Sequence, residues 1–137
     1  MVFAEGARVR FGQFMLLFMA IACSGCTAQL NDQRTLTLEV GEIRTIVLAP
    51  VEREQIIKIA ARSPDCPISV YVYLSENDEE VDRKITLGKP SDLILSSQTE
   101  SEEIALEANI PANKEAMVRV ASASPDKATV HLVITSP

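Results

Sequence analysis

Strict alternation of apolar and polar residues is the feature that most restricts the fold of this chain. Residues 35–40 read Thr-Leu-Thr-Leu-Glu-Val, and the same period of two returns in several later segments. Because successive side chains of a β-strand point to opposite faces, this period predicts strands with one face buried and the other in water. An amphipathic helix needs a period near 3.6, and helical signals are poor throughout. The sequence therefore predicts an all-β chain.

Nine short strands are expected, and the segments between them are typical of turns. Ser63-Pro64-Asp65 and Ser124-Pro125-Asp126 combine the fixed φ of proline with side chains that favour turns. Gly41-Glu42 fits a two-residue type II′ hairpin between the first two strands. Short strands at this spacing indicate a single antiparallel β-sandwich, jelly-roll-like in character. The predicted strands are residues 35–40, 43–48, 55–61, 68–74, 84–87, 92–96, 103–108, 116–121 and 129–135.

The alternation also predicts which residues form the core. Only 4% of the residues are aromatic, so aliphatic side chains must fill the space between the sheets. The expected core residues are Leu36, Leu38, Val40, Ile57, Ile59, Val70, Val72, Leu74, Leu93, Leu95, Ile104, Leu106, Val118, Val120, Val130, Leu132 and Ile134.

The N-terminal region has a different character. Arg8 and Arg10 precede residues 11–22, which carry no charge and are mostly apolar. As a helix these residues would span about 18 Å, whereas a bilayer's hydrocarbon core is about 30 Å thick. The segment is therefore too short to cross a membrane and has the length of a signal-peptide hydrophobic region. We expect residues 1–22 to be a removable leader, residues 23–34 a short polar tether, and residues 35–137 the folded domain.

The end of this leader resembles the lipobox of bacterial lipoproteins. Ala20-Ile21-Ala22 places small or apolar residues directly before Cys23, whose thiol is the nucleophile that would accept a diacylglyceryl group. Ser24-Gly25 before Cys26 offers a second acceptor, but Cys23 is favoured because the position three before Cys26 lacks a bulky aliphatic residue. The resemblance implies a lipid-anchored protein of the cell envelope. In that family, Asp after the lipidated cysteine is typical of inner-membrane retention, so Ser24 after Cys23 (or Thr27 after Cys26) implies by resemblance the outer membrane of a Gram-negative cell.

Two other interpretations of these cysteines remain open. Cys23 and Cys26 form a Cys-x-x-Cys pair, which elsewhere marks redox or zinc sites. A redox pair should open a helix after a strand, and a zinc site needs a second pair, so the context favours neither. The other alternative is an ordinary secretory leader with incidental cysteines. Membrane lipid, reached through the acyl chains, is the partner that the leading interpretation implies.

Net charge excludes one class of partner. The chain carries −6, and because Arg8, Arg10 and Glu5 lie in the leader, the residues from Ser24 onward hold 11 basic and 18 acidic side chains, a net charge of −7. Such a surface repels polyphosphate, so no nucleic-acid partner is expected. Envelope proteins or glycans are the partners that remain.

The folded part resembles the bacterial pre-peptidase C-terminal domain, a β-sandwich. Residues 54–59 (Glu-Gln-Ile-Ile-Lys-Ile) and 68–74 (Ile-Ser-Val-Tyr-Val-Tyr-Leu) match strands of that family, and residues 115–120 and 129–134 match its last two strands. The resemblance covers residues 41–135 and implies a jelly-roll-like sandwich of the kind found on secreted and surface proteins. The aspartate-rich strand entry of the family is missing, which weakens any calcium or substrate role carried over from it.

An acidic segment is the strongest candidate for a metal site. Five carboxylates fall within residues 76–82, and Ca²⁺ takes six to eight oxygen ligands. No glycine supplies the turn of an EF-hand, so a solvated loop is the alternative. A weaker acidic cluster comprises Glu100, Glu102 and Glu103. The candidate calcium ligands are Glu76, Asp78, Glu79, Glu80 and Asp82.

Tyr71 and Tyr73 alternate onto one strand face, where they would either form a sugar-binding platform or cover the edge of the core. A displayed calcium- or carbohydrate-binding module is therefore the alternative to a non-catalytic binding or assembly module of unknown ligand.

The remaining reactive residues do not form a catalytic set. His131 is the only histidine, and its phase between Val130 and Leu132 points it to solvent or to a neighbouring strand. No serine lies in a strand-turn-helix elbow. Cys66 precedes a predicted strand and either forms a disulfide with Cys26 or is a buried thiol. The sequence therefore predicts a protein that is not an enzyme and needs no cofactor.

Overall fold

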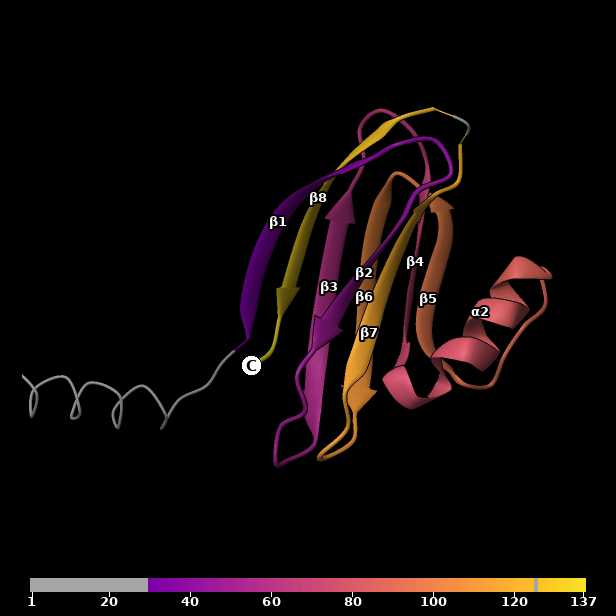
Figure 1. The fold of residues 1–137 in the computed structure, drawn as a ribbon. Coiled ribbons are helices and arrows are strands. Elements are labelled where there is room, and N and C mark those ends of the chain that lie inside the picture. Colours follow the sequence, from indigo (N-terminus) through magenta and orange to yellow (C-terminus); the bar gives the residue numbers. More distant parts are fainter. Residues whose placement is uncertain (1–29, 125) are drawn as a thin grey trace, which may run out of the picture.

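Two four-stranded antiparallel sheets pack face to face (Figure 1). This computed structural model describes residues 30–124 and 126–137, and the predicted leader and both N-terminal cysteines lie outside them. The first sheet has the order β1 (Asn31–Leu38), β8 (Ala128–Thr135), β3 (Gln55–Arg62) and β6 (Glu103–Ile110). The second has the order β2 (Ile43–Leu48), β7 (Ala116–Ser122), β4 (Ile68–Leu74) and β5 (Ile94–Ser101). The predicted β-sandwich is confirmed.

Eight of the nine predicted strands are present, two with the predicted bounds and the others shifted at one or both ends. Among the first four strands, the bounds differ most in β1, which begins at Asn31 whereas the predicted strand begins at residue 35. Residues 31–34, which we assigned to the tether, therefore pair with β8 as part of the sheet. The strand predicted at residues 84–87 is wrong, because those residues end a helix, α2 (Asp78–Thr86), which follows a short 3₁₀ helix, η1 (Ser75–Asn77).

Charge and a glycine explain why the acidic segment is helical. Residues 78–80 are acidic in the first turn of α2, and Arg83 and Lys84 lie in its last turn, so both ends complement the helix dipole. Gly88 has a φ of 67°, which a glycine adopts without steric cost. The N–H of Lys89 bonds to the carbonyl of Lys84 at 2.9 Å, and that of Gly88 bonds to Ile85 at 3.0 Å. These two bonds form a Schellman motif that ends the helix.

The connection between β1 and β2 is a turn between sheets. The predicted type II′ hairpin is wrong, because β1 pairs with β8 and β2 pairs with β7. The N–H of Glu42 bonds to the carbonyl of Glu39 at 2.9 Å, and Gly41, the third residue of this turn, has a φ of 73°. A positive φ at that position fits a type II turn, in which glycine is the second of the two central residues. In the type II′ turn that we predicted, glycine would be the first of them.

The core lies between the sheets and is aliphatic, as predicted. Most of the expected residues are buried, and Leu36, Leu74 and Leu106 are partly buried against them. Three predictions are wrong. Val40 is 66% exposed in the turn, Leu93 is exposed just before β5, and Leu95 is exposed in β5, which is an edge strand. Several other hydrophobic residues are buried although the sequence analysis did not predict them in the core. They are Ile46, Leu48, Ala61, Cys66, Ile68, Tyr73, Val81, Ala108, Ile110, Ala116 and Ala128.

The outer faces of the two sheets differ. The helix α2 lies against β4, on the second sheet (Figure 1). In the described part of the chain, η1 and α2 are the only helices, and neither covers the first sheet. Neither helix is long and apolar enough to cross a membrane. The outer face of the β1-β8-β3-β6 sheet is therefore left open to solvent.

Candidate binding surface

A row of small side chains crosses the outer face of the first sheet. Ala60 on β3 stands opposite Ala105 on β6, and on its other side it stands opposite Val133 on β8. The neighbouring rows carry much longer side chains: Arg62 and Glu103 on one side, and Lys58 and Glu107 on the other. Because these residues alternate with buried ones along each strand, the short and long rows share the solvent face. The short row is therefore sunk between two taller, charged rows.

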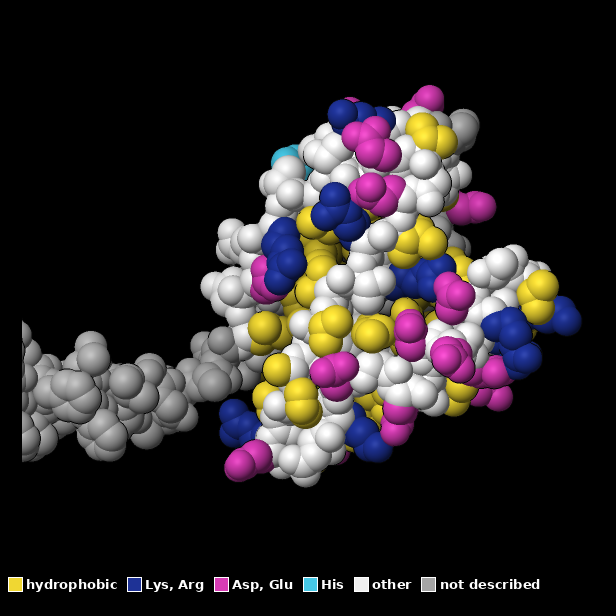
Figure 2. Space-filling model, in the orientation of Figure 1, with side chains coloured by type: hydrophobic (Ala, Val, Ile, Leu, Met, Phe, Trp, Pro, Cys, Tyr) yellow, Lys and Arg dark blue, Asp and Glu magenta, His cyan; other side chains and the backbone are white. Residues whose placement is uncertain are grey.

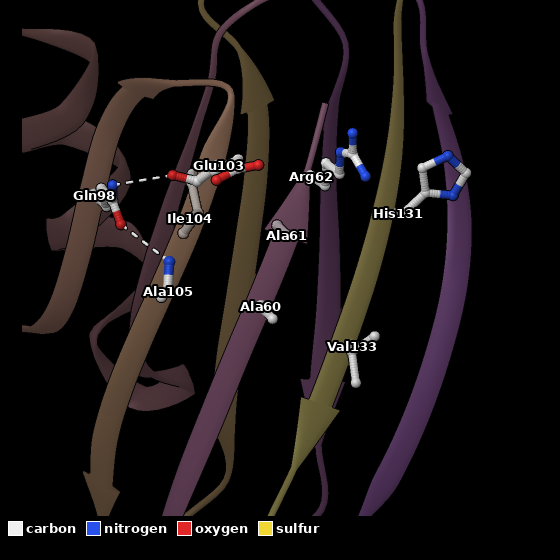
Figure 3. A pocket seen from close by; sticks show the side chains of 9 residues that line it. All are labelled: Ala60, Ala61, Arg62, Gln98, Glu103, Ile104, Ala105, His131 and Val133. Carbon is white, nitrogen blue, oxygen red and sulfur yellow. Dashed lines mark hydrogen bonds between the residues drawn. The ribbon is translucent and has the colours of Figure 1, made fainter. Parts of the chain in front are cut away.

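This difference in side-chain length creates a shallow hollow, which we call the alanine hollow (Figure 3). Its volume is about 500 Å³, within the range of small-ligand sites. It opens to solvent over β3 and β6, and most of its lining is apolar. The lining residues are Ala60, Ala61, Arg62, Gln98, Glu103, Ile104, Ala105, His131 and Val133.

Charged groups of opposite sign border the alanine hollow without neutralising each other. Arg62 and Glu103 are direct partners in the register of β3 and β6. No ion pair within 4 Å joins either of them to another residue of the described chain. Figure 3 shows the guanidinium of Arg62 turned toward His131, on the side away from Glu103. Both charges are therefore available to a ligand.

The Gln98 side chain forms one wall of the hollow and covers the edge of β6. Its Oε1 accepts a hydrogen bond from the N–H of Ala105 at 3.1 Å, and its Nε2 donates to the carbonyl of Glu103 at 3.2 Å (Figure 3). The hydroxyl of Ser101 also donates to that carbonyl, at 2.7 Å. One amide thus bonds to the edge strand as a neighbouring strand would.

The open face continues past β8 as a second hollow of about 320 Å³. It is lined by residues 33–35 and 131–133, so it shares His131 and Val133 with the alanine hollow. His131 is exposed, as predicted, and its Nδ1 lies 3.4 Å from the Oγ1 of its cross-strand partner Thr35. The imidazole therefore stands between the two hollows.

The five predicted calcium ligands lie on η1 and α2 and contact different partners. Glu76 pairs with Lys114 at 3.1 Å, and Glu80 pairs with Arg83 at 2.6 Å. The other contacts are Asp78 with Tyr73 and Asp82 with Arg119, while Glu79 makes no ion pair with a described residue. Figure 2 shows basic and acidic side chains together over the helix. Across the described residues, no three His, Cys, Asp or Glu side chains form a group that could hold a metal ion.

Tyr71 and Tyr73 do not form an exposed platform. Tyr73 is fully buried on the outer face of β4, beside the helix, and its hydroxyl donates to Asp78 Oδ1 at 2.8 Å. Burial, together with that hydrogen bond and the Asp78 charge, raises the pKa of Tyr73 to about 12, against the opposing effect of Arg119. Tyr71 is partly buried and lies opposite Arg119 in the register. The structure therefore supports the interpretation that the tyrosines cover the edge of the core, and not that they form a sugar-binding platform.

Arg119 is a polar residue that the sequence did not reveal. Alternation in β7 places it on the outer face of the second sheet, but α2 encloses it so that its side chain is only 8% exposed. Its Nη1 bonds to Asp82 Oδ1 at 2.5 Å, while its Nε is buried with no hydrogen-bond partner among the described residues. Burial lowers the pKa of Arg119, but Asp82 and Tyr73 outweigh it and raise the value above the ordinary one. No local signal in the sequence could show that a helix would cover this strand.

Cys66 is buried, as one of the two interpretations requires, with its Sγ 3.9 Å from both the Ser122 hydroxyl and the Lys127 carbonyl. Cys26, its predicted disulfide partner, and Cys23, the predicted lipidation site, lie outside the described residues, so the disulfide and the lipidation both stay predictions. Glu100 lies near the end of β5 and Glu102 is the single residue between β5 and β6, whereas Glu103 borders the alanine hollow.

No family model matches this chain, and neither does any curated protein. Among solved structures, the Yersinia pseudotuberculosis-derived mitogen has a TM-score of 0.54 at 8% identity, over 79% of this chain and 86% of the mitogen. A lysozyme inhibitor from Aeromonas hydrophila has a TM-score of 0.54 at 10% identity, over 78% of this chain and 86% of the inhibitor. The pre-peptidase C-terminal domain of a Bacillus anthracis collagenase has a TM-score of 0.52 at 12% identity, over 77% of this chain and 89% of that domain. At such identities the likeness shows the fold alone: the chain is an antiparallel β-sandwich.

Proposed function

We propose that this protein is a lipid-anchored, non-catalytic module of the bacterial cell envelope that binds its partner across the alanine hollow. The observation that carries the binding role is the open sheet face, where an apolar floor of about 500 Å³ is bordered by charges that the described chain leaves unpaired. Apolar floors with a few convergent polar groups are typical of binding sites.

The fold fits a binding role. The similar structures include an inhibitor of g-type lysozyme and a domain of a collagenase. They support the proposal because a sandwich of this shape serves as an inhibitor of another protein in one of them. The lining of the alanine hollow has one histidine and no serine or cysteine nucleophile, which favours recognition over catalysis.

Matched variants test the binding surface. Ala60→Phe would fill the hollow, whereas Thr45→Phe adds the same ring to an exposed position of β2 in the other sheet. A photoreactive residue at position 133, at the rim of the hollow, is expected to cross-link the envelope partner in cells. The cross-link should disappear with Ala60→Phe and persist with Thr45→Phe. Equal cross-linking by both variants would refute a role for the hollow.

The anchor is tested separately by intact mass. If Cys23 is the lipidated residue, membrane-extracted protein should begin at Cys23 and carry acyl chains, and Cys23→Ala should abolish both. Loss on Cys26→Ala alone would move the site to Cys26. A mature protein that is free of lipid and starts beyond both cysteines would contradict the anchor and leave only the binding role. Fractionation of the two membranes tests the proposed outer-membrane location.

A further inference from the structure

We propose that the alanine hollow binds a short peptide with small aliphatic side chains and free ends, its ammonium at Glu103 and its carboxylate at Arg62. This inference deepens the proposed function and rests on it. The ligand class follows from the charges, the floor and the side chains that the hollow lacks.

The charges are placed for a zwitterion. Arg62 and Glu103 are opposite each other on adjacent antiparallel strands, where Cβ atoms lie about 5 Å apart. With the guanidinium turned toward His131, their charged ends lie on opposite sides of β3 (Figure 3). A dipeptide or tripeptide spans about 7–10 Å when extended, which fits a carboxylate on one side and an ammonium on the other. Arginine binds carboxylates with paired, charge-assisted hydrogen bonds.

The floor fits small apolar side chains. Ala60, Ala105 and Val133 form a continuous row, and the alanines extend no further than Cβ. A methyl group resting there would be buried without displacing a protein side chain. A large aromatic ligand side chain would instead meet Gln98, whose amide is held in place by its bonds to β6.

Among the described residues, the hollow has no phenyl, phenol or indole ring on which a sugar could stack, and its one ring is the small imidazole of His131. The two tyrosines of the chain are both on β4, in the other sheet, and its four phenylalanines all precede residue 19. The chain has no tryptophan. Without a larger ring, a sugar would depend on hydrogen bonds from polar lining residues such as Arg62, Glu103 and Gln98, so the composition favours a peptide over a glycan.

The overall charge also favours a zwitterion. The residues from Ser24 onward carry a net charge of −7, which repels ligands that bear a carboxylate alone. A peptide with both ends free has no net charge and avoids this repulsion. Blocking either end should therefore weaken binding, and blocking the amino end should weaken it most.

Calorimetric titration of the full-length protein in detergent micelles tests this inference with three probes. These are trialanine, N-acetyl-trialanine and trialanine amide. We expect trialanine to bind about ten-fold or more tightly than either blocked peptide, because each loses one charge-assisted contact. Equal affinity for all three, or no binding of trialanine at millimolar concentration, would overturn the inference.

Charge-neutral variants assign the two ends. With Arg62→Gln, trialanine and its amide should bind equally, and with Glu103→Gln, trialanine and its N-acetyl form should bind equally. Lys58→Gln is the matched control, because it removes a charge from the same face one row away. Loss of the preference in Lys58→Gln alone would contradict the assignment.

A failed ligand class can be told apart from a failed site. If Ala60→Phe abolishes the envelope cross-link while no peptide probe binds, the hollow is a binding site for something else, and competition by neutral oligosaccharides would identify a glycan. If Ala60→Phe leaves the cross-link intact, the proposed function itself fails.

Discussion

Arg119 on β7 and Asp82 on α2 form an ion pair with an N–O distance of 2.5 Å, although the arginine side chain is 8% exposed and the aspartate 56%. The pair joins the buried guanidinium of the second sheet to an exposed carboxylate of α2, the helix that covers Arg119. With the Tyr73–Asp78 hydrogen bond and the buried Val81, it accounts for how α2 is attached to the sandwich. Asp78 and Asp82 are four residues apart, so both point to the same side of the helix.

Removing the aspartate should loosen the helix. Asp82→Asn would leave the Arg119 charge buried with a weaker partner. We expect the free energy of unfolding to fall by about 1–2 kcal/mol, which is less than for a fully buried ion pair because water screens the half-exposed Asp82. Urea denaturation measures this fall. Glu79→Gln, on the same helix and without an ion pair to the described residues, is the control and should change stability by less than about 0.5 kcal/mol. Equal effects would mean that the pair does not hold α2.

Tyr73 predicts a loss of stability in alkali. Its folded pKa is raised to about 12 from the ordinary value of 10.0, so the folded state keeps the phenol proton longer than the unfolded state does. The stabilisation is therefore fully present below pH 10 and is lost as the pH rises from 10 to 12. Denaturation midpoints measured across this range should fall, and the fall should be smaller in Tyr73→Phe. An identical pH profile in the variant would show that another group is responsible.

The end of α2 depends on one backbone conformation. A Cβ on Gly88 would meet no atom within 4 Å, so any cost of Gly88→Ala comes from the positive φ of 67°. We expect a loss of about 1 kcal/mol in the free energy of unfolding. Lys89→Ala, which keeps its backbone bond to Lys84, should cost much less. Thermal melts of both variants make the comparison.

Gln98 should protect the edge of β6 from other molecules. Gln98→Ala would leave the N–H of Ala105 and part of the Glu103 carbonyl without their side-chain partner. Unpaired strand edges promote pairing between molecules, so this variant should associate at high concentration, as light scattering would show. Gln33→Ala, at an exposed position of β1, should remain as dispersed as the parent. Association of both variants would point to a general loss of solubility.

Calcium should not stabilise the protein. Four of the five acidic side chains of residues 76–82 already contact different partners and do not converge. The melting temperature should therefore be the same with millimolar calcium as with a chelator, because only ligands that bind the folded state raise it. A calcium-dependent rise that disappears on Asp78→Asn would restore the metal site that the acidic run predicts.

Local patterns predicted what is local in this fold. The predicted bounds of β2 and β4 are correct to the residue, because turn-forming residues lie directly beside them: Gly41-Glu42 precedes β2, and Pro67 precedes β4. The helix was not predicted, because residues 76–82 were interpreted as an acidic loop, calcium-binding or solvated, and residues 84–87 as a strand. Gly88 and Pro90, which follow Arg83 and Lys84, are nevertheless signals of a helix end.

The candidate site could not be predicted in the same way. Ala60, Ala105 and Val133 are unremarkable residues on three separate strands, and only the register of β3 with β6 and β8 makes them neighbours. Arg62 and Glu103 are likewise 41 positions apart in the chain. Such a register depends on the packing of the whole sandwich, which no short window of sequence contains.

The position of β8 has a consequence for how the molecule forms. It is the last described strand in chain order, yet it lies between β1 and β3, so the first sheet cannot be completed until residues 128–135 have been synthesised. Contacts between such distant segments slow folding, because the chain loses much entropy before they form. In a nascent chain, β1 would thus stay unpaired until β8 has left the ribosome, and the surface that carries the alanine hollow would be among the last parts of the molecule to form.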